Sequence, residues 1–580
     1  MTCENNHLFF NQGGVTMKRD ERTAKRWALG LATATALGAL FAAPAMADDR
    51  AELFKAHKGG TMRLVTNAAE GTLDPQINYT AKNWQVFQHL YDGLVISKKV
   101  DGVDSTKVVP DLAEEIPAPQ DGGKTYVFKL RKGIKFSNGN EVTVDDVVAS
   151  FQRIFKISGP TSGTFYNGIV GADACIKTAA TCTLEGGVVA DKAAGTVTFH
   201  LVAADPEFFF KISVPHAAIV PADTPAKDMG TTPIPGTGAY MAESYDPNAR
   251  LKLVRNPHFK EWNVEAQPDG FPDEIDYDFG LTGEAAITAV ENGQADWVFD
   301  APAADRLPEL GTKFASQVHI SPLSAFWYAP MNVNLPPFND VRVRQALNYA
   351  VDRDAVVGLF GGTQLGTPTC QILPPNFPGH EDSCVYTKDP GTTWSAPDLD
   401  KAKALVKESG TAGQKVTIIT EDTDVSKAVG TYLQSVLNDL GYEASVKPIS
   451  SNIQFTYIQN TNNKVQISVS QWFQDYPAAS DFLNVLFGCD SFHAGSDASV
   501  NISGFCDKGI DAKMKAALAQ AVTDQDGANK EWAKIDKAVM DQAPAVPLFN
   551  PKRVDFVSAR VGNFQFSYMY NWIFPLSWVK

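Results

Sequence analysis

The sequence lacks the short motifs that mark a metal site or a catalytic centre. Its nine histidines are scattered, and neither a CxxC nor an HExxH pattern occurs, which argues against a zinc site. No G-x-S-x-G turn is present, and no histidine stands near a candidate Ser or Cys nucleophile. These absences predict a protein that is not an enzyme and uses no metal or other cofactor. Catalytic groups can come from distant parts of a chain, so a secreted hydrolase stays open as an alternative.

Positive charge is also scarce. Lys and Arg number 51 against 66 Asp and Glu, which gives a net charge of −15 at pH 7. An acidic chain of this kind is a poor partner for nucleic acid or for an anionic lipid surface. It is compatible with cationic ligands but does not identify one. The hydrophobic fraction of 44% is that of a packed globular protein rather than a disordered one.

Long apolar runs are confined to the beginning of the chain. A basic segment that starts at Lys18 precedes an alanine-rich apolar run over residues 27–43, and small residues at 45 and 47 flank Met46 as in a signal-peptide cleavage site. Residues 1–47 are therefore predicted to be a leader, with Asp48 as the first mature residue. A retained signal anchor is the alternative, since the run is at the short limit for a bilayer span.

The leader predicts an exported protein, in the periplasm or on the extracellular face of the cell membrane. No cysteine stands at the cleavage site, so a lipid anchor is not expected. Met17 is a better start than Met1, because the basic region begins directly after it.

Cysteine is sparse, with seven residues, of which Cys3 lies in the leader. Six cysteines permit many connectivities, so their pairing cannot be fixed from the sequence alone. Short intervening loops and an exported chain favour three sequential pairs as disulfides. The predicted disulfides are Cys175–Cys182, Cys370–Cys384 and Cys489–Cys506.

Residues 398–472 alternate between helical and strand patterns. Asp398 is an N-cap for a helix that ends before Gly410, and a second helical pattern covers residues 424–440. Three strands are predicted around these helices, at residues 415–420, 442–449 and 465–472. Alternating strands and helices indicate a mostly parallel α/β sheet with right-handed crossovers.

The segment just after the third of these strands is the candidate site. It contains Trp472, Phe473, Gln474, Asp475 and Tyr476. In parallel sheets, ligands bind beyond the carboxyl ends of the strands. Three aromatic rings, an amide and a carboxylate are therefore predicted where a cleft is expected.

Residues 336–354 read PPFNDVRVRQALNYAVDRD. Asn339 and Asp340 are N-cap residue types, and the apolar residues that follow recur at the spacing of one buried helix face. Taken alone, the pattern predicts an ordinary amphipathic helix. As a string, it resembles the signature of family 5 extracellular solute-binding proteins, which are peptide-binding receptors of ABC importers.

Other segments resemble the same family in the same order. They are a first strand at 59–63, Leu73-Asp74-Pro75, a helix over 85–94, the segments 109–113, 126–131, 133–139 and 144–147, and the later pieces 235–240 and 255–257. Each piece is weak alone, but the ordered set extends over nearly the whole mature chain.

The resemblance implies an α/β fold of the periplasmic-binding-protein type, with two lobes joined by a hinge and an extra inserted domain (type II, cluster C-like). Lobe I is expected from residues 48–79, 233–320 and 548–580, the inserted second domain from 80–232, and lobe II, the third domain, from 321–547. The hinge strands are expected near residues 321–333 and 547–551.

The resemblance also implies roles for the candidate residues. Oligopeptide-binding members carry a motif that is similar to Trp472–Tyr476, and its aspartate meets the peptide amino terminus, so Asp475 is expected to do so here. The alternatives for Asp475 are a cap on the turn before the next helix and plain exposure to water. Trp472, Phe473 and Tyr476 are expected to line side-chain pockets, with core packing as the alternative, above all for Phe473.

Two further positions are less defined. Trp327 or Tyr328 is expected to face the cleft, because strand alternation lets only one point each way. Asp481 departs from the family pattern, in which a neutral residue usually precedes the Phe. It is expected to favour the helix N-terminus, with ligand contact as the alternative.

The function implied is that of a monomeric receptor outside the cytoplasm, which captures an oligopeptide between two lobes and delivers it to the permease subunits and, through them, the ATPase of an ABC importer. The same fold with a metal chelate, haem, a sugar or an opine as ligand is the alternative. The sequence does not identify the residue that would meet a ligand carboxylate, so peptide length is open.

Overall fold

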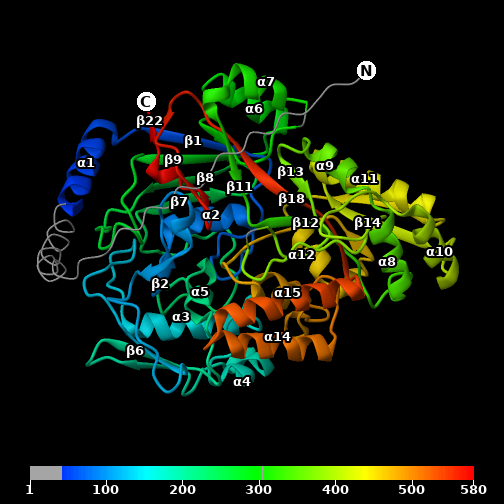
Figure 1. Cartoon of the computed structure of the whole chain (residues 1–580). Helices are drawn as coiled ribbons and strands as arrows, with labels where there is room; N and C mark the ends of the chain where they lie inside the picture. The colour runs from blue at the N-terminus through cyan, green and yellow to red at the C-terminus, as the bar shows by residue number, and fades with distance from the viewer. Residues whose placement is uncertain (1–41, 304, 376) are drawn as a thin grey trace, which may run out of the picture. The chain divides into compact units, whose positions relative to one another are not determined.

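The structure is a computed structural model that describes residues 42–303, 305–375 and 377–580 (Figure 1). Helix α1 (Ala42–His57) belongs to a unit that ends at Lys58, and Gly59–Lys580 forms a second compact unit. The basic segment and the apolar run of the predicted leader as far as residue 41 lie outside the described residues. Among the residues that are described, none of the helices is both long and apolar enough to cross a membrane.

One mixed sheet has the strand order β10-β1-β9-β8-β7. Strand β1 lies parallel to β9 and β10, whereas β8 is antiparallel to both β7 and β9. Its buried face, with Met62, Leu64 and Ile275, packs on helix α2. The elements are β1 (Thr61–Thr66), α2 (Ala81–Leu90), β7 (Tyr240–Asp246), β8 (Arg250–Arg255), β9 (Glu274–Phe279), α6 (Gly283–Glu291), β10 (Trp297–Val298) and α7 (Leu307–Lys313).

The part of the sequence between α2 and β7 forms an antiparallel sheet, β4-β6-β5, which packs on helix α3. A capping box fixes the start of α3, because Asp146 Oδ2 accepts hydrogen bonds from both the backbone N–H and the hydroxyl of Thr143. The elements here are β2 (Val95–Ser97), β3 (Val108–Pro110), β4 (Thr125–Lys129), α3 (Val144–Lys156), α4 (Ala172–Lys177), β5 (Val188–Asp191), β6 (Thr196–His200) and α5 (Phe208–Lys211).

The helix expected at residues 85–94 lies earlier, at Ala81–Leu90. Thr80 caps it by accepting a hydrogen bond from the Asn83 N–H, and the chain becomes extended at Tyr91. The extended turn carries Asp92 into a buried polar group with Lys99 and Asp111, all of whose side chains are solvent-inaccessible or nearly so. Lys99 Nζ lies 3.9 Å from Asp92 Oδ1. Burial raises the pKa of both carboxyls and lowers the pKa of Lys99.

The predicted α/β segment is confirmed as a parallel sheet, β15-β14-β16. Asp398 accepts a hydrogen bond from the Lys401 N–H at the start of α10, and Gly410 ends that helix with φ of 66°. The elements are α10 (Leu399–Ser409), β14 (Lys415–Glu421), α11 (Asp424–Asp439), β15 (Glu443–Ile449), α12 (Gln454–Gln459) and β16 (Ile467–Ser468).

The third strand of this segment was expected to run unbroken over residues 465–472, and this is wrong. Strand β16 pairs with β14, whereas β17 (Ser470–Phe473) pairs with β12 (Ala325–Pro330) in another sheet. The change occurs at Val469, whose N–H donates to the Ile419 carbonyl. Both halves are largely buried, so the apolar alternation continues through the junction and does not reveal the change of partner.

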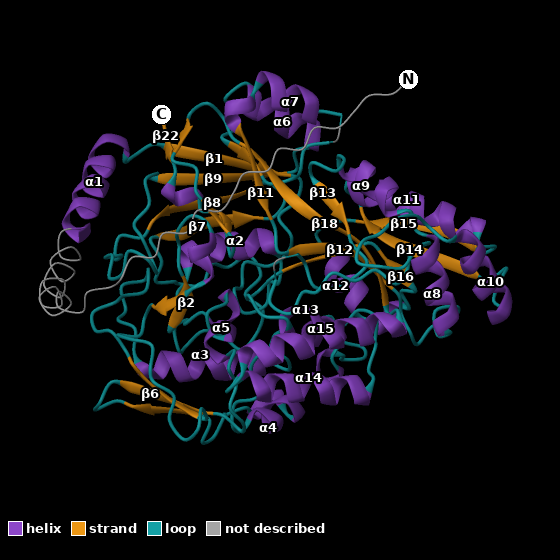
Figure 2. Cartoon of the chain, in the orientation of Figure 1, coloured by secondary structure: helices purple, strands orange, loops and turns teal. Residues whose placement is uncertain are grey.

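Strand β18 (Ala545–Phe556) connects these regions (Figure 2). Its first half pairs with β12 and with β13 (Gly366–Pro368), and its second half pairs with β11 (Val318–Pro322). An isolated bridge between Val557 and Trp297 continues from it towards β10. Three further helices are α13 (Ser480–Phe487), α14 (Lys508–Ala521) and α15 (Gln525–Gln542). The short strands after β18 are β19 (Val561–Gly562), β20 (Phe566–Ser567), β21 (Asn571–Trp572) and β22 (Trp578–Val579).

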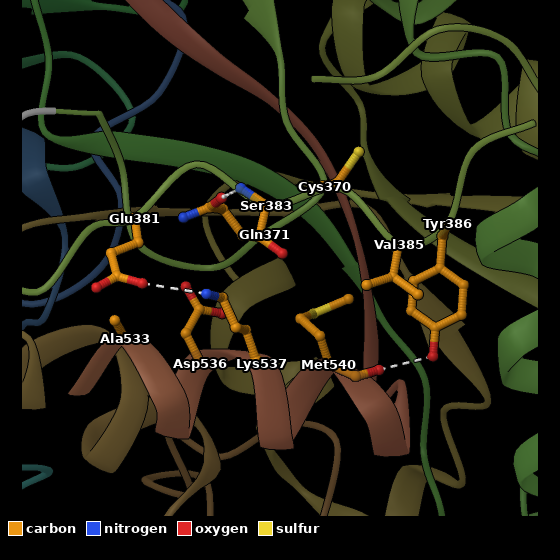
Figure 3. Close-up of a pocket in the computed structure, with 10 residues that line it drawn as sticks. All are labelled: Cys370, Gln371, Glu381, Ser383, Val385, Tyr386, Ala533, Asp536, Lys537 and Met540. Carbon is orange, nitrogen blue, oxygen red and sulfur yellow. Dashed lines mark hydrogen bonds and ion pairs between the residues drawn. The ribbon is translucent and has the colours of Figure 1, made fainter. Parts of the chain in front are cut away.

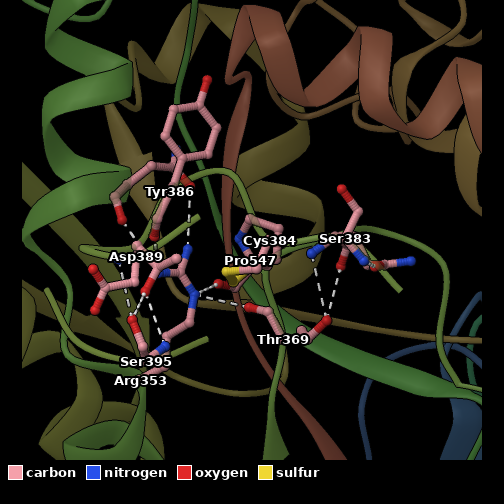
Figure 4. Close-up of a disulfide and its surroundings, with 12 residues drawn as sticks. Arg353, Thr369, Ser383, Cys384, Tyr386, Asp389, Ser395 and Pro547 are labelled. Carbon is pink, nitrogen blue, oxygen red and sulfur yellow. Dashed lines mark hydrogen bonds between the residues drawn. A yellow bond between two sulfur atoms is a disulfide. The ribbon is translucent and has the colours of Figure 1, made fainter. Parts of the chain in front are cut away.

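The signature segment forms helices α8 (Val341–Ala350) and α9 (Arg353–Phe360), with Asp340 as the N-cap of α8. Arg353 is fully buried, and its guanidinium donates to the carbonyls of Thr369 and Pro547 at 2.8 and 2.9 Å (Figure 4). Further bonds reach the carbonyls of Asn348 and Tyr386. The signature arginine thus joins α8, β18 and the loop closed by one disulfide.

The three predicted disulfides are confirmed, and each links its sequential pair. Cys370–Cys384 closes the loop that Arg353 holds. Beside this disulfide is a cavity of about 20 Å³, which is the room of one water molecule (Figure 3). Asp536 in its wall accepts hydrogen bonds from the Ile372 and Leu373 N–H groups.

Candidate ligand-binding site

Asp475 lies in the loop that joins β17 to α13, and only 8% of it is exposed. Its Oδ2 accepts a hydrogen bond from the hydroxyl of Tyr79, which precedes α2 and lies 396 residues away in the chain. Burial raises the pKa of Asp475 to about 8. The loop therefore presents a buried carboxyl to a residue from the opposite end of the sequence.

Asp481 is the second acid of this loop and is completely buried in the first turn of α13. Its Oδ2 accepts the Asp475 N–H at 2.8 Å, so it fixes the backbone from which the Asp475 side chain projects. Burial, followed by the nearby Asp475 carboxyl, raises the pKa of Asp481 well above its usual range. Its placement agrees with the expected helix N-terminus, and its hydrogen bond adds a role in orienting Asp475.

Aromatic rings surround the hydroxyl that bonds Asp475. The Tyr79 ring stacks on Trp84, with centroids 5.2 Å apart, and meets Trp472 edge-on at 5.7 Å. His216 contacts it at 4.8 Å and Phe455 at 6.5 Å. The side chain of Trp472 therefore lies beside the candidate anchor, on a wall built from four separate parts of the chain.

His216 is held as a neutral ring. Its Nε2–H faces the Asn78 carbonyl at 3.0 Å, and its Nδ1 lies 3.1 Å from the Thr161 hydroxyl. Burial lowers the pKa of His216 to about 3. It thus supplies an uncharged ring edge to Tyr79 and no positive charge to Asp475.

Tyr476 packs between rings of the 80–232 segment. Its ring contacts Phe165 at 5.3 Å and stacks with Phe210 at 6.4 Å, and its hydroxyl lies 3.0 Å from Ser480 Oγ. Ser480 in turn donates to Glu207. Tyr476 is 1% exposed, so its ring is covered on both sides by other residues.

Gln474 and Phe473 face different surroundings. Gln474 Nε2 donates to the Tyr568 carbonyl at 2.6 Å, which ties the loop to the C-terminal segment. Phe473 is half-buried and lies opposite Ala325 in the β17–β12 pair. A backbone-to-side-chain hydrogen bond also joins the two sides of the site, because the Glu70 N–H donates to Asn452 Oδ1 at 2.9 Å.

Trp327 and Tyr328 point to opposite faces of β12, as alternation requires. Trp327 stacks on Phe549 with centroids 5.5 Å apart, and Tyr328 stacks on Phe326 at 4.5 Å. Both are buried in the core that includes the sheet of β12 and β18. Their ring contacts within the described residues are with these core neighbours, and not with the rings around Asp475.

The sequence interpretation missed four contributors to the site: Tyr79, His216, Glu207 and Ser480. Tyr79 lies in a loop, His216 lies in the single 3-10 turn Pro215–Ala217, and Glu207 and Ser480 lie at helix ends. No periodic pattern at these places marks a side chain as inward. The first three come from a segment far from Asp475 in the chain. For Tyr79, the neighbouring N-cap Thr80 marks a helix start but gives no indication of its partner.

The arrangement is that of a two-lobed α/β binding protein. Its fold matches solved structures of peptide-binding proteins over 90% of this chain. Examples are the DppA of Helicobacter pylori in complex with the peptide STSA (TM-score 0.76, 19% identity, 98% of that chain) and the OppA of Haemophilus influenzae in complex with RPPGFSPFR (TM-score 0.74, 20% identity, 99% of that chain).

The family is defined by the sequence comparison. The model of bacterial extracellular solute-binding proteins, family 5, matches residues 107–494, and the chain belongs to this family. Among curated relatives, the periplasmic oligopeptide-binding protein OppA of Salmonella typhimurium is 27% identical over 85% of this chain and 87% of its own length. The probable deoxycholate-binding periplasmic protein YgiS of Escherichia coli is 26% identical over 87% and 90%.

Proposed function

We propose that this protein is a receptor outside the cytoplasm that captures an oligopeptide by its amino end and delivers it to an ABC importer. The observation that carries this proposal is the buried Asp475 carboxyl, which forms no ion pair with a Lys, Arg or His of the described chain. A buried carboxylate is costly without a cationic partner. The α-ammonium of a peptide would supply both the charge and the hydrogen bonds.

The surroundings of Asp475 suit a peptide whose side chains vary. Trp472 and Tyr79 offer apolar ring faces, which hold side chains without requiring one shape. Strand β17 ends directly before the Asp475 loop and is the edge strand of the order β11-β18-β12-β17, so its outer edge can pair with a peptide main chain. Main-chain pairing of this kind does not read sequence and is compatible with many peptides.

We also propose that the protein closes around its ligand. Lobe I would comprise residues 48–79, 233–320 and 548–580, with 80–232 inserted, and lobe II would comprise 321–547. The halves of β18 pair with different strands, which supports a hinge at residues 547–551 and the nearby 321–333. Small-angle scattering with saturating peptide should show a compaction, and an unchanged radius of gyration would contradict closure.

The decisive experiment uses Asp475→Asn and a random library of peptides with free or N-acetylated amino ends, read by native mass spectrometry. Free peptides should bind the wild type, and acetylation should weaken binding. The substitution should cost about 2–5 kcal/mol for free peptides, because one partner of a buried charge pair is lost. Acetylation should cost the variant much less, since the two changes remove the same contact.

Equal binding of free and acetylated peptides by the wild type would place the anchor elsewhere. A non-peptide ligand of the same fold is the second candidate, because the name of one relative describes a deoxycholate-binding protein. Deoxycholate carries a carboxylate and lacks an ammonium, so the buried acid of this chain favours the peptide. Mass spectrometry of ligand released from the purified protein separates the two.

The remaining elements of the proposed role are a monomer that acts at the periplasmic or extracellular face of the membrane and is neither an enzyme nor a nucleic-acid-binding protein. Its partners would be the permease subunits and, through them, the ATPase. A screen against generic ester and peptide substrates checks the absence of hydrolase activity.

A further inference from the structure

The hydrogen bond of 2.8 Å from the Asp475 N–H to Asp481 Oδ2 brings the two buried carboxyl groups of this turn close together. Two ionised carboxylates repel strongly at such a distance when both are buried, so one of them must carry a proton. Asp481 is 0% exposed, and its Oδ1 has no hydrogen-bond partner in the described protein. The pair therefore has one acceptor atom that the surrounding protein leaves unsatisfied.

No positively charged side chain balances this pair among the residues that the structure describes. The nearest ammonium in the adjoining network, Lys211, pairs with Asp205 at 2.7 Å and with Glu207 at 3.4 Å. His216 is neutral because its burial lowers the pKa of the ring. The titratable groups that face the pair from the elements around it are Tyr79, Tyr166, Tyr476, Glu207 and, behind Glu207, Lys211 and Asp205.

We propose that Asp475 and Asp481 form a proton-exchange site, which holds one proton in the ligand-free protein and releases it when the ammonium end of a ligand binds. This inference rests on the proposed function, because it needs an ammonium ligand. It gives Asp481 a role beyond orienting the Asp475 backbone: Asp481 determines that the anchor is a carboxyl pair rather than a single carboxylate.

The exchange leaves the charge of the buried site unchanged. Before binding, two carboxyls and one proton carry a net charge of −1. After binding, two carboxylates and one ammonium also carry −1, and the proton has passed to bulk water. The N–H donors of the ammonium take the place of the lost proton, and they can also satisfy the unpartnered Oδ1 of Asp481. The site therefore avoids accumulating buried charge in either state.

The release of a proton on binding determines how the ligand affinity changes with pH. Where binding releases one proton, affinity for an amino-free ligand rises by about tenfold for each unit increase in pH. The rise ends at the pH where the ligand-free pair has already lost its proton. A ligand whose amino end is acetylated has no cation to exchange, so its binding should not show this slope.

The test compares the wild type with Asp481→Asn, whose amide oxygen can still accept the Asp475 N–H. Infrared spectra of the ligand-free proteins over a range of pH report protonated buried carboxyls. The band should disappear at a lower pH in the variant, because the like charge of the second carboxyl is absent there. Asp490→Asn is the matched control, because Asp490 is a half-exposed acid that follows α13 and pairs with Lys515. It should leave the band in place.

Calorimetric titration with tri-alanine in buffers of different ionisation enthalpy then counts released protons. The wild type should release close to one proton per peptide near pH 6.5, and it should keep releasing that proton up to a higher pH than the variant does. Carboxyl bands that disappear at the same pH in the two proteins, or wild-type binding without proton release, would overturn the exchange while Asp475 remained the anchor. Failure of every amino-free peptide to bind, or equal binding of the acetylated form, would instead remove the proposed function together with the exchange.

Discussion

The hydroxyl of Ser480 donates a hydrogen bond of 2.6 Å to Oε2 of Glu207, although 273 residues separate the two in the chain. Both side chains are buried. Ser480 begins α13, the helix that also carries Asp481, and Glu207 precedes α5 in the 80–232 segment. The two sides of the candidate site are thus bonded directly to each other beside Asp475.

Ser480→Ala should lower the free energy of unfolding by about 1–3 kcal/mol, because it leaves a buried carboxyl oxygen without its hydroxyl donor. The residual contact of Glu207 with Lys211 should keep the loss towards the lower end. Denaturant titration measures the change. Ser316→Ala at an exposed position is the control, and an equal effect of both substitutions would contradict the importance of the contact.

Lys99→Met should destabilise the protein by about 3–5 kcal/mol, since it removes the cation beside two buried acids. Adding Asp92→Asn to this variant should restore part of the loss, because one uncompensated carboxyl is then neutral. Lys98→Met is the matched control, because the neighbouring Lys98 pairs with the more exposed Glu265 and should matter much less. Chemical denaturation of the three variants checks both expectations.

Arg353→Lys should cost roughly 2–4 kcal/mol despite conserving the charge. A lysine cannot reach the carbonyls of Thr369, Pro547 and Tyr386 together, so buried acceptors lose their donors. Arg342→Lys, at a half-exposed pair with Asp340, should have little effect. A thermal-unfolding midpoint for Arg353→Lys that equals that of the control would show the guanidinium fork to be unimportant.

Stability should depend on pH through Asp536. Burial raises the pKa of Asp536 to about 6, so between about pH 4 and 6 the folded protein keeps a proton that the unfolded chain has released. The contribution of this group to stability is therefore fully present below pH 4 and decreases by roughly 3 kcal/mol as pH rises through 6. Unfolding measured from pH 4 to 7 should show this slope reduced in Asp536→Asn.

Patterns within a few neighbouring residues predicted those helices and strands whose ends are fixed by the same residues. Asp398 and Gly410 fix the ends of α10 through their own side chain and backbone, so the helix could be read from a few residues. The strand pairing of β16 and β17 could not be predicted in this way. The change of sheet at Val469 depends on distant partners, which are Ile418 for β16 and Phe326 for β17. Apolar alternation records burial and carries no information on which strand lies beside it.

The candidate site also has a part that the sequence predicts and a part that it does not. Asp475 and Trp472 were found because one short segment contains both, after a strand whose end faces a cleft in folds of this class. The hydroxyl of Tyr79 completes the site from the other end of the chain, and its position depends on how the lobes pack. The sequence marks Asp481 as a departure from the family pattern. Its role in orienting Asp475 follows only from its burial and from its hydrogen bond with the Asp475 N–H.

Strand β18 also bears on how the molecule loses its structure. Its first half is held by β12 and β13 and its second half by β11, and the residue that follows it bridges to Trp297. A strand shared in this way cannot leave one set of partners without fraying the other. Heating should therefore melt the regions on either side of β18 in a single cooperative transition, and the amides at the centre of β18 should be among the last to exchange with solvent.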